Sequence, residues 1–196
     1  MNICVFASSS EKLDAVYFEA AKALGARLAR TGHTVVFGAG DDGLMGALAR
    51  GAKEAGGYLI GVIPHMFDVQ GVVFSKCDEV HKTKTMRERK ALMAQKADAF
   101  IALPGGFGTL EELLEVITLK QLCVHNKPIA IIDTNGFYSH LVSQFGETVN
   151  QGFAADGALT AFGVYEDIDE AIAYIDRCDG SRTYAKHAWL DQEENA

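Results

Sequence analysis

The stretch Ala99-Phe100-Ile101-Ala102-Leu103-Pro104-Gly105-Gly106-Phe107-Gly108-Thr109 carries the strongest local signal for the fold. Its first five residues form an apolar run that predicts a buried strand, and the run ends at Pro104. Three glycines follow, and they allow a tight turn and a close approach of the backbone to a ligand. A helix is predicted to begin at Thr109. A strand, a short turn and a helix in this order form the repeating unit of a parallel sheet.

Apolar strand-like runs and helical patterns alternate along the rest of the chain. This alternation predicts an α/β fold in which helices cover both faces of a parallel sheet. Such sheets bind ligands beyond the carboxyl ends of their strands. We expect one domain over residues 1–180 and a polar tail over 181–196. Strands are expected at 2–7, 33–37, 58–63, 77–81, 98–103, 128–133 and 162–165, and helices at 11–30, 43–55, 84–96, 109–123, 136–150 and 167–176.

The composition is that of an ordinary globular protein. The chain has 196 residues, of which 48% are hydrophobic and 22% are charged. The net charge of −8 disfavours nucleic acid as a partner, because proteins that bind phosphate backbones usually carry the opposite sign. The sequence has no apolar run of membrane-spanning length, so no association with a membrane is expected.

The cysteines predict a reducing environment. None of them stands at metal-ligand spacing to another cysteine or a histidine, so no metal site is expected. Most fall in apolar runs, which is typical of buried, reduced thiols. We therefore expect a cytoplasmic protein. The cysteines are Cys4, Cys77, Cys123 and Cys178.

The glycine-rich loop after the strand at 98–103 is a candidate phosphate site. Its amide groups can point at a ligand, and the start of the following helix is positively polarised. The loop contains no lysine or aspartate. We predict that a phosphate binds to Gly105, Gly106, Phe107, Gly108 and Thr109.

A second glycine-rich loop, from Gly38 through Gly40 to Gly43, formally matches the dinucleotide fingerprint. Asp41 and Asp42 place negative charge where a pyrophosphate would sit, and the next strand ends without an acidic residue for a ribose diol. These features count against a dinucleotide. Two interpretations stay open: a tight turn capped by aspartate, and a loop in which Gly40 and Gly43 let the backbone approach a small ligand.

A third loop follows the first predicted strand and contains Ser8 and Ser9. Their hydroxyl groups can form hydrogen bonds with a polar ligand. They can equally cap the next helix. Position at a strand end favours neither interpretation over the other.

Glu112 has a structural and a functional interpretation. Thr109-x-x-Glu112 fits a capping box, in which both side chains bind amides at a helix start. On a helical wheel, however, Glu112 lies on the apolar stripe of Val116, whereas Glu111 and Glu115 lie on a more polar stripe. A carboxylate on an apolar stripe beside an anion-binding loop is a candidate for chemistry.

Arg89 and Lys90 raise the same question on the predicted helix at 84–96. They flank an apolar stripe that contains Met86 and Met93. Their long side chains can simply cover the edge of the core while the charges stay in water. Alternatively they form a cationic pair in a binding site, where an arginine suits the bidentate grip of a carboxylate or a phosphate.

At these residues the sequence resembles the Lonely guy (LOG) family. The run Pro-Gly-Gly-x-Gly-Thr-x-x-Glu at 104–112 carries the resemblance, together with Met86-x-x-Arg89-Lys90 upstream. The similarity covers the chain up to about residue 175 and includes Gly-Leu-Met-Gly at 43–46.

The resemblance implies a Rossmann-like doubly wound parallel sheet, a homodimer, and a hydrolase that needs no cofactor. The implied reaction cleaves the N-glycosidic bond of an adenosine-type 5′-monophosphate, either AMP or an N6-substituted cytokinin riboside 5′-monophosphate, to the free base and ribose 5-phosphate. It also implies that Arg89 and Glu112 are the catalytic pair. The implied nucleotide contacts are Lys90, the residues from Gly106 to Thr109, and Thr118.

Two features of the sequence depart from the family pattern and bear on the choice of base. The second loop reads Gly-Ala-Gly-Asp-Asp-Gly, where plant members typically have three glycines. In the family, an acidic residue that contacts the ligand often follows the position of Pro64. The comparable stretch here reads Asp-Val-Gln-Gly at 68–71, and the sequence does not assign that contact to one of its residues.

Other functions stay open from the sequence. One alternative is a nucleotide-binding module without hydrolysis, and another is a dinucleotide-dependent enzyme that uses Gly38 to Gly43. Proteins of this kind are also called possible lysine decarboxylases. No lysine here stands beside a phosphate-binding loop as a pyridoxal anchor.

Overall fold

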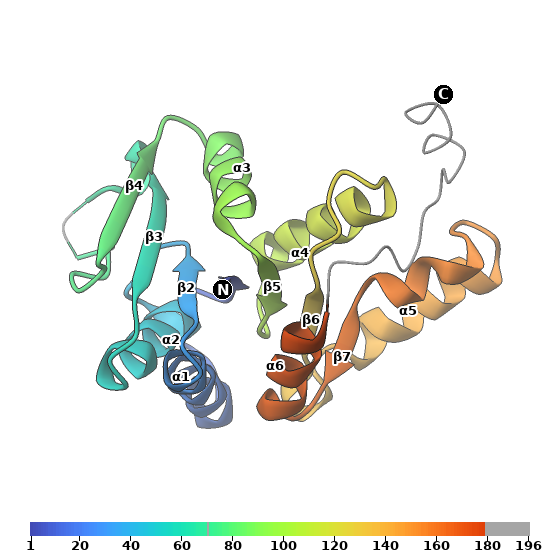
Figure 1. The fold of residues 1–196 in the computed structure, drawn as a ribbon, viewed down its shortest axis with the longest axis horizontal. Coiled ribbons are helices and arrows are strands. Elements are labelled where there is room, and N and C mark those ends of the chain that lie inside the picture. Colours follow the sequence, from blue (N-terminus) through green and yellow to red (C-terminus); the bar gives the residue numbers. More distant parts are fainter. Residues whose placement is uncertain (70, 179–196) are drawn as a thin grey trace.

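Seven parallel strands form one sheet in the part of the chain that the computed structural model describes, residues 1–69 and 71–178. The strand order is β4-β3-β2-β1-β5-β6-β7 (Figure 1). Every neighbouring pair is parallel, as the alternating sequence pattern predicts. The strands are β1 (Asn2–Phe6), β2 (Thr34–Phe37), β3 (Leu59–Pro64), β4 (Glu79–Thr83), β5 (Ala99–Ala102), β6 (Ile129–Ile132) and β7 (Gly163–Tyr165).

Helices cover both faces of this sheet (Figure 1), so the predicted Rossmann-like doubly wound fold is confirmed. Alternate residues of β1 enter different cores: Ile3 and Val5 pack with α1, α2 and α6, whereas Cys4 and Phe6 pack with α3, α4 and α5. The strands β3, β5 and β6 are buried along their whole length, and their sequences are continuous apolar runs because both of their faces are covered. The helices are α1 (Ala15–Arg30), α2 (Gly43–Glu54), α3 (Met86–Lys96), α4 (Phe107–Gln121), α5 (Ser139–Asn150) and α6 (Ile168–Arg177).

The element boundaries differ from the predicted ones at a few places. The helix predicted from residue 11 begins at Ala15, and the strand predicted at 77–81 lies at Glu79–Thr83. Between the strands predicted at 58–63 and 77–81, the chain forms a 3₁₀ turn, His65–Phe67. The polar tail predicted at 181–196 lies outside the described residues, and the division into one domain and a tail stays a prediction.

The order of the strands places a crevice between β1 and β5. The chain builds the sheet outward from β1 to β4, then returns to the other side of β1 to add β5, β6 and β7. The segments that follow β1 and β5 therefore leave the sheet side by side and separate, which opens a binding site at the carboxyl ends of the strands. The amide of Leu103 donates to the carbonyl of Phe6 across 2.9 Å and holds the two strand ends together.

A buried tyrosine supports the end of β5. The hydroxyl of Tyr138 donates to the carbonyl of Leu103 across 2.8 Å, and its backbone amide donates to Oδ1 of Asp133 across 2.6 Å. Tyr138 is 1% exposed. Tyr138 thus fixes the position of Leu103, which leads into the glycine-rich loop.

Candidate active site

A cavity of about 440 Å³ lies at the carboxyl ends of β1, β2, β3 and β5, where the strand order reverses. Residues from all three loops singled out in the sequence reach it. Its apolar lining comes from the end of β1, from α2, from the end of β3 and the segment after it, and from α3. The polar side chains that line it are Ser8, Ser9, Ser10, Asp42, Arg89, Thr109 and Glu112.

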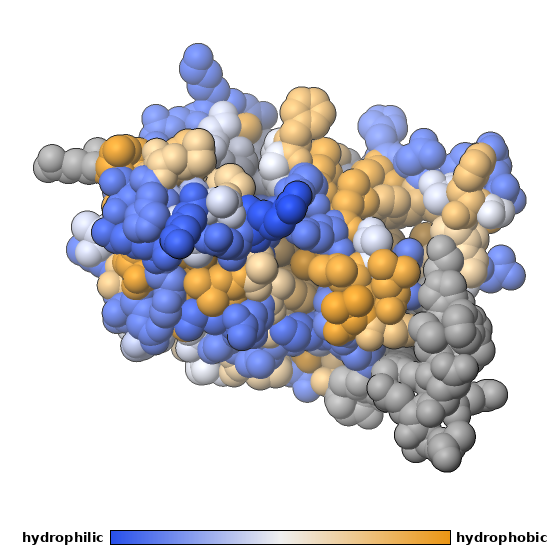
Figure 2. Space-filling model, turned by 90° about the horizontal axis from the view of Figure 1, so that it is seen from above, coloured by the Kyte–Doolittle hydropathy of each residue, from blue (hydrophilic) through white to orange (hydrophobic). Residues whose placement is uncertain are grey.

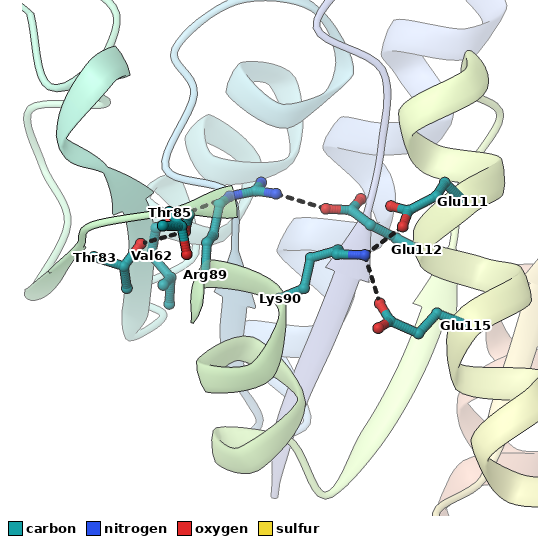
Figure 3. A network of polar contacts seen from close by, with 8 residues as sticks. All are labelled: Val62, Thr83, Thr85, Arg89, Lys90, Glu111, Glu112 and Glu115. Atoms are coloured by element: carbon teal, nitrogen blue, oxygen red, sulfur yellow. Dashed lines mark hydrogen bonds and ion pairs between the residues drawn. The ribbon is translucent and has the colours of Figure 1, made fainter. Parts of the chain in front are cut away.

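A buried ion pair joins α3 to α4 in this cavity. Nη1 of Arg89 donates to Oε1 of Glu112 across 2.6 Å (Figure 3). The two side chains are 10% and 12% exposed. Nε of Arg89 donates in addition to the carbonyl of Val62 at 3.2 Å, which fixes the plane of the guanidinium. The structure thus brings together the two residues that the resemblance implies as a catalytic pair.

Burial and the ion pair act in opposite directions on Glu112. Removal from water raises the pKa of the Glu112 carboxyl, and the charge and hydrogen bond of Arg89 oppose that effect. The net direction is upward. A carboxyl with a raised pKa and one specific charged partner in a cavity is typical of functional sites.

The position of Arg89 depends on its helix start and on a glycine. Thr85 caps α3, since its side chain accepts from the amide of Glu88 at 3.1 Å. Nη2 of Arg89 then passes Gly38 so closely that a Cβ at that position would lie 2.0 Å away. Gly38 is therefore the residue that leaves room for the guanidinium.

The glycine-rich loop after β5 presents the start of α4 to the cavity. The helix begins at Phe107, with Gly106 as its N-cap. Within the described residues, the amides of Phe107, Gly108 and Thr109 have no hydrogen-bond partner. Because the start of a helix is also positively polarised, these free amides form an anion site. Gly106, Gly108 and Thr109 line the cavity.

The predicted capping box at Thr109 and Glu112 is wrong. Since the helix begins two residues earlier than predicted, Thr109 lies inside its first turn and is buried. Glu112 is directed to Arg89 instead of the helix amides. The capping interpretation of Glu112 is therefore excluded by geometry, and the interpretation as a site residue is the one that agrees with the structure.

In the second glycine-rich loop, two of the amides at the start of the following helix are already occupied. The amides of Leu44 and Met45, at the start of α2, both donate to the carbonyl of Ser8, at 2.9 and 3.3 Å. Gly43 has a φ of +59° and lies so close to Ser9 that a Cβ would meet its carbonyl carbon at 2.5 Å. Gly43 therefore allows the close contact between the two loops. The amides of Leu44 and Met45, which a pyrophosphate would use, are hydrogen-bonded to the carbonyl of Ser8.

Several predicted contact residues lie outside the cavity. Nζ of Lys90 forms ion pairs with Glu111 and Glu115 on α4, the latter at 2.9 Å (Figure 3). Thr118 is exposed on the same helix, and Phe107 is 92% exposed. Gly105 and Gly43 are also absent from the lining of the cavity. Of the predicted nucleotide contacts, the lining includes Ser8, Ser9, Gly40, Gly106, Gly108 and Thr109.

The apolar wall of the cavity was not identified from the sequence. Met86 and Met93 were assigned to the apolar stripe of their helix, and the structure places both at the cavity as well. Their stripe beside Arg89 was the available signal. The remaining apolar wall residues come from distant segments and include Met45, Ile63, Phe67 and Val72.

Apolar side chains also lie on the surface. Figure 2 shows hydrophobic residues gathered in patches between hydrophilic ones on the upper face. On α4, Leu114 is 41% exposed in addition to Phe107, and Leu122, the residue just after the helix, is 44% exposed. Helix α4 thus carries apolar side chains on its exposed side as well as on its buried side. No helix of the described part is long and apolar enough to span a membrane, and no group of three metal-ligating side chains occurs there.

The chain is similar to known proteins over most of its length. Residues 45–175 match the model of a family described as possible lysine decarboxylase. The chain is 39% identical over 181 residues to a probable cytokinin riboside 5′-monophosphate phosphoribohydrolase, LOGL3, of Oryza sativa subsp. japonica, a match that covers 89% of this chain and 86% of the rice protein.

A second rice protein is similar to the chain in sequence, and one solved structure is similar to it in fold. The cytokinin riboside 5′-monophosphate phosphoribohydrolase LOG is 45% identical over 156 residues, which cover 80% of this chain and 64% of that protein. The molybdenum cofactor carrier protein of Chlamydomonas reinhardtii has a TM-score of 0.68 at 23% identity over 90% of this chain and 96% of its own, which shows a shared fold. The family model covers more than half of the sequence, and the first rice protein aligns over 86% of its own length. The chain therefore belongs to the family described as possible lysine decarboxylase, which includes the LOG phosphoribohydrolases.

Proposed function

We propose that the protein hydrolyses the N-glycosidic bond of adenosine-type nucleoside 5′-monophosphates and releases the free base and ribose 5-phosphate. The rice relatives are named for this type of reaction on cytokinin riboside 5′-monophosphates. The observation that carries the proposal is the buried pair of Arg89 and Glu112 in a cavity whose rim holds free helix amides.

The phosphate anchors the substrate at the start of α4. The free amides of Phe107, Gly108 and Thr109 suit the oxygens of a monophosphate, and the helix dipole favours its negative charge. Binding energy from this remote group positions the reacting carbon of the ribose.

Glu112 stabilises the transition state. Cleavage of a glycosidic bond passes through an oxocarbenium-like state, in which positive charge develops at the anomeric carbon. A carboxylate near that carbon stabilises the charge and orients the attacking water. Arg89 is a positioning residue: its charge and hydrogen bond oppose the rise in the pKa of Glu112 that burial causes, and the hydrogen bond of 2.6 Å holds the orientation of the carboxyl group.

The base occupies the apolar wall. Its flat faces suit the apolar side chains that line the cavity, among them Phe67, Val72 and Met86. This arrangement accepts AMP and N6-substituted relatives.

The residues do not fit the decarboxylase that the family description suggests. A pyridoxal-dependent decarboxylase needs a lysine that forms a Schiff base with the cofactor. The described residues that line the cavity include no lysine, and Lys90 is engaged by Glu111 and Glu115. The dinucleotide alternative is disfavoured by the occupied amides of α2.

The proposal includes a homodimer in the cytoplasm. The exposed apolar residues of α4, among them Phe107, support a second copy as the partner of this helix. The cysteines of the described part are all free thiols, which fits a reducing compartment.

The test is an assay without added cofactor. The protein is incubated with AMP and with N6-isopentenyl AMP, and free base and ribose 5-phosphate are quantified. We expect release of base by the wild type and a loss of at least about 10³-fold in kcat for Glu112→Gln, with an unchanged circular dichroism spectrum. Binding of AMP without release of base supports a non-catalytic module, and near-normal turnover by Glu112→Gln contradicts the assigned role.

A further inference from the structure

Asp42 is a carboxylate of the cavity that the proposed reaction does not use. It is the N-cap of α2, and its side chain accepts no hydrogen bond from the helix amides. Among the described residues it forms no ion pair either, although it lines the same cavity as Glu112. A free acceptor in a substrate cavity is available for a donor on the ligand.

The other aspartates of this region are already engaged. Asp41, the preceding residue, pairs with Nη1 of Arg50 at 2.8 Å and lies outside the cavity. Asp68, after β3, pairs with Nζ of Lys82 at 2.6 Å and is also outside. Asp42 and Glu112 are thus the two acidic residues of the cavity lining in the described part of the chain.

The backbone holds Asp42 beside the serine loop. Gly43, the next residue, packs against Ser9, and the amides of Leu44 and Met45 donate to the carbonyl of Ser8. Asp42 therefore lies with Ser8, Ser9 and Ser10 in the polar wall of the cavity. This wall borders the apolar lining, because the amide of Asp41 donates to the carbonyl of Val72 across 2.9 Å.

Charge decides which part of a nucleotide can face this wall. The phosphate is a dianion near neutral pH, and an unpaired carboxylate repels it. The apolar faces of the base suit the apolar wall. The hydroxyl groups of the ribose are the donors that remain, and a carboxylate beyond a strand end accepts hydrogen bonds from a ribose in related α/β folds.

We propose that Asp42 determines the specificity for ribose by accepting a hydrogen bond from the 2′- or 3′-hydroxyl of the substrate. This inference rests on the proposed function. It predicts that the protein prefers ribonucleotides to deoxyribonucleotides.

The test compares AMP with 2′-deoxy-AMP and 3′-deoxy-AMP as substrates. We expect the wild type to prefer AMP over at least one deoxy analogue by about tenfold or more, the size of one hydrogen bond to a charged group. In Asp42→Ala this preference falls to about threefold or less. Asp42→Asn, which keeps an acceptor oxygen, retains part of it.

Asp41→Ala is the matched control, since it removes the neighbouring carboxylate outside the cavity and should keep the preference of the wild type. Equal preference in the wild type and in Asp42→Ala overturns the inference. If the wild type binds AMP but releases no base, the same comparison is made with dissociation constants from calorimetry, which separates failure of this inference from failure of the proposed hydrolysis. Absence of any AMP binding overturns both.

Discussion

Substitution of Gly38 by alanine should lower the activity of the protein without unfolding it. The new Cβ would lie 2.0 Å from Nη2 of Arg89 and 3.1 Å from Sδ of Met45. To reach ordinary van der Waals contact at 3.4 Å, the guanidinium must move by about 1.4 Å. The end of an arginine side chain can make such a movement, so the fold survives.

The movement breaks the pair with Glu112, whose hydrogen bond spans 2.6 Å. A hydrogen bond to a charged group contributes about 1.5–3 kcal/mol, and 1.4 kcal/mol corresponds to a factor of ten. A misplacement of about 1 Å costs on the order of 10²-fold in rate. Both estimates predict that kcat/KM for AMP falls by between about 10-fold and 150-fold.

The measurement is steady-state kinetics of base release, combined with thermal unfolding. Gly146→Ala is the matched control, because Gly146 lies within α5 and a Cβ there would meet nothing within 4 Å. We expect the control to keep its rate and to gain about 0.5–1 kcal/mol of stability from helix propensity. If Gly38→Ala keeps kcat/KM within twofold of the wild type, the alignment of Arg89 and Glu112 does not limit the reaction.

Three further predictions concern the same region. Burial raises the pKa of Glu112, and only the ionised form stabilises positive charge, so the acid limb of kcat/KM against pH should lie above the ordinary glutamate value of about 4.3. Arg89→Gln removes a charge that lowers this pKa and should move the limb of any residual activity further upward. An acid limb at or below about 4.3 contradicts this role of Glu112. Lys90→Ala should reduce kcat/KM by no more than about threefold, because Lys90 contacts Glu111 and Glu115 outside the cavity. A loss as large as that of Arg89→Gln in the same assay would show that Lys90 acts on the substrate. Tyr138→Phe should lower the free energy of unfolding by about 1–3 kcal/mol in urea, since it leaves the carbonyl of Leu103 buried without its donor; an unchanged midpoint would mean that another group satisfies this carbonyl.

The fold could be predicted from the sequence because its signals are local. Strands buried on both faces are continuous apolar runs, so β5 and its neighbours were found within about two residues. The start of α4 was less accurate, since Thr109 and Glu112 fit a capping box that the structure does not form. The glycine before Phe107 caps that helix without a side-chain signal.

The site could be predicted only where one helix contains the signal. A helical wheel separates Glu112 from Glu111, and the structure agrees: Glu112 lies in the cavity and Glu111 faces Lys90 outside it. Whether Lys90 points to the cavity or to α4 depends on how α3 and α4 pack against each other. A helical wheel of one helix carries no information about that packing. The apolar wall was hidden for the same reason, because Phe67 and Val72 come from a segment without periodicity.

The contact of the Ser8 carbonyl with the amides of Leu44 and Met45 makes the loop after β1 and the start of α2 a single mechanical unit. A ligand that orders the serines must also slow the local opening of the helix start, because the two amides exchange with solvent only when that carbonyl withdraws. The rate of hydrogen exchange at the amides of residues 44 and 45 should therefore report whether a ligand is bound at the serine loop. The measurement can be made on the wild-type protein.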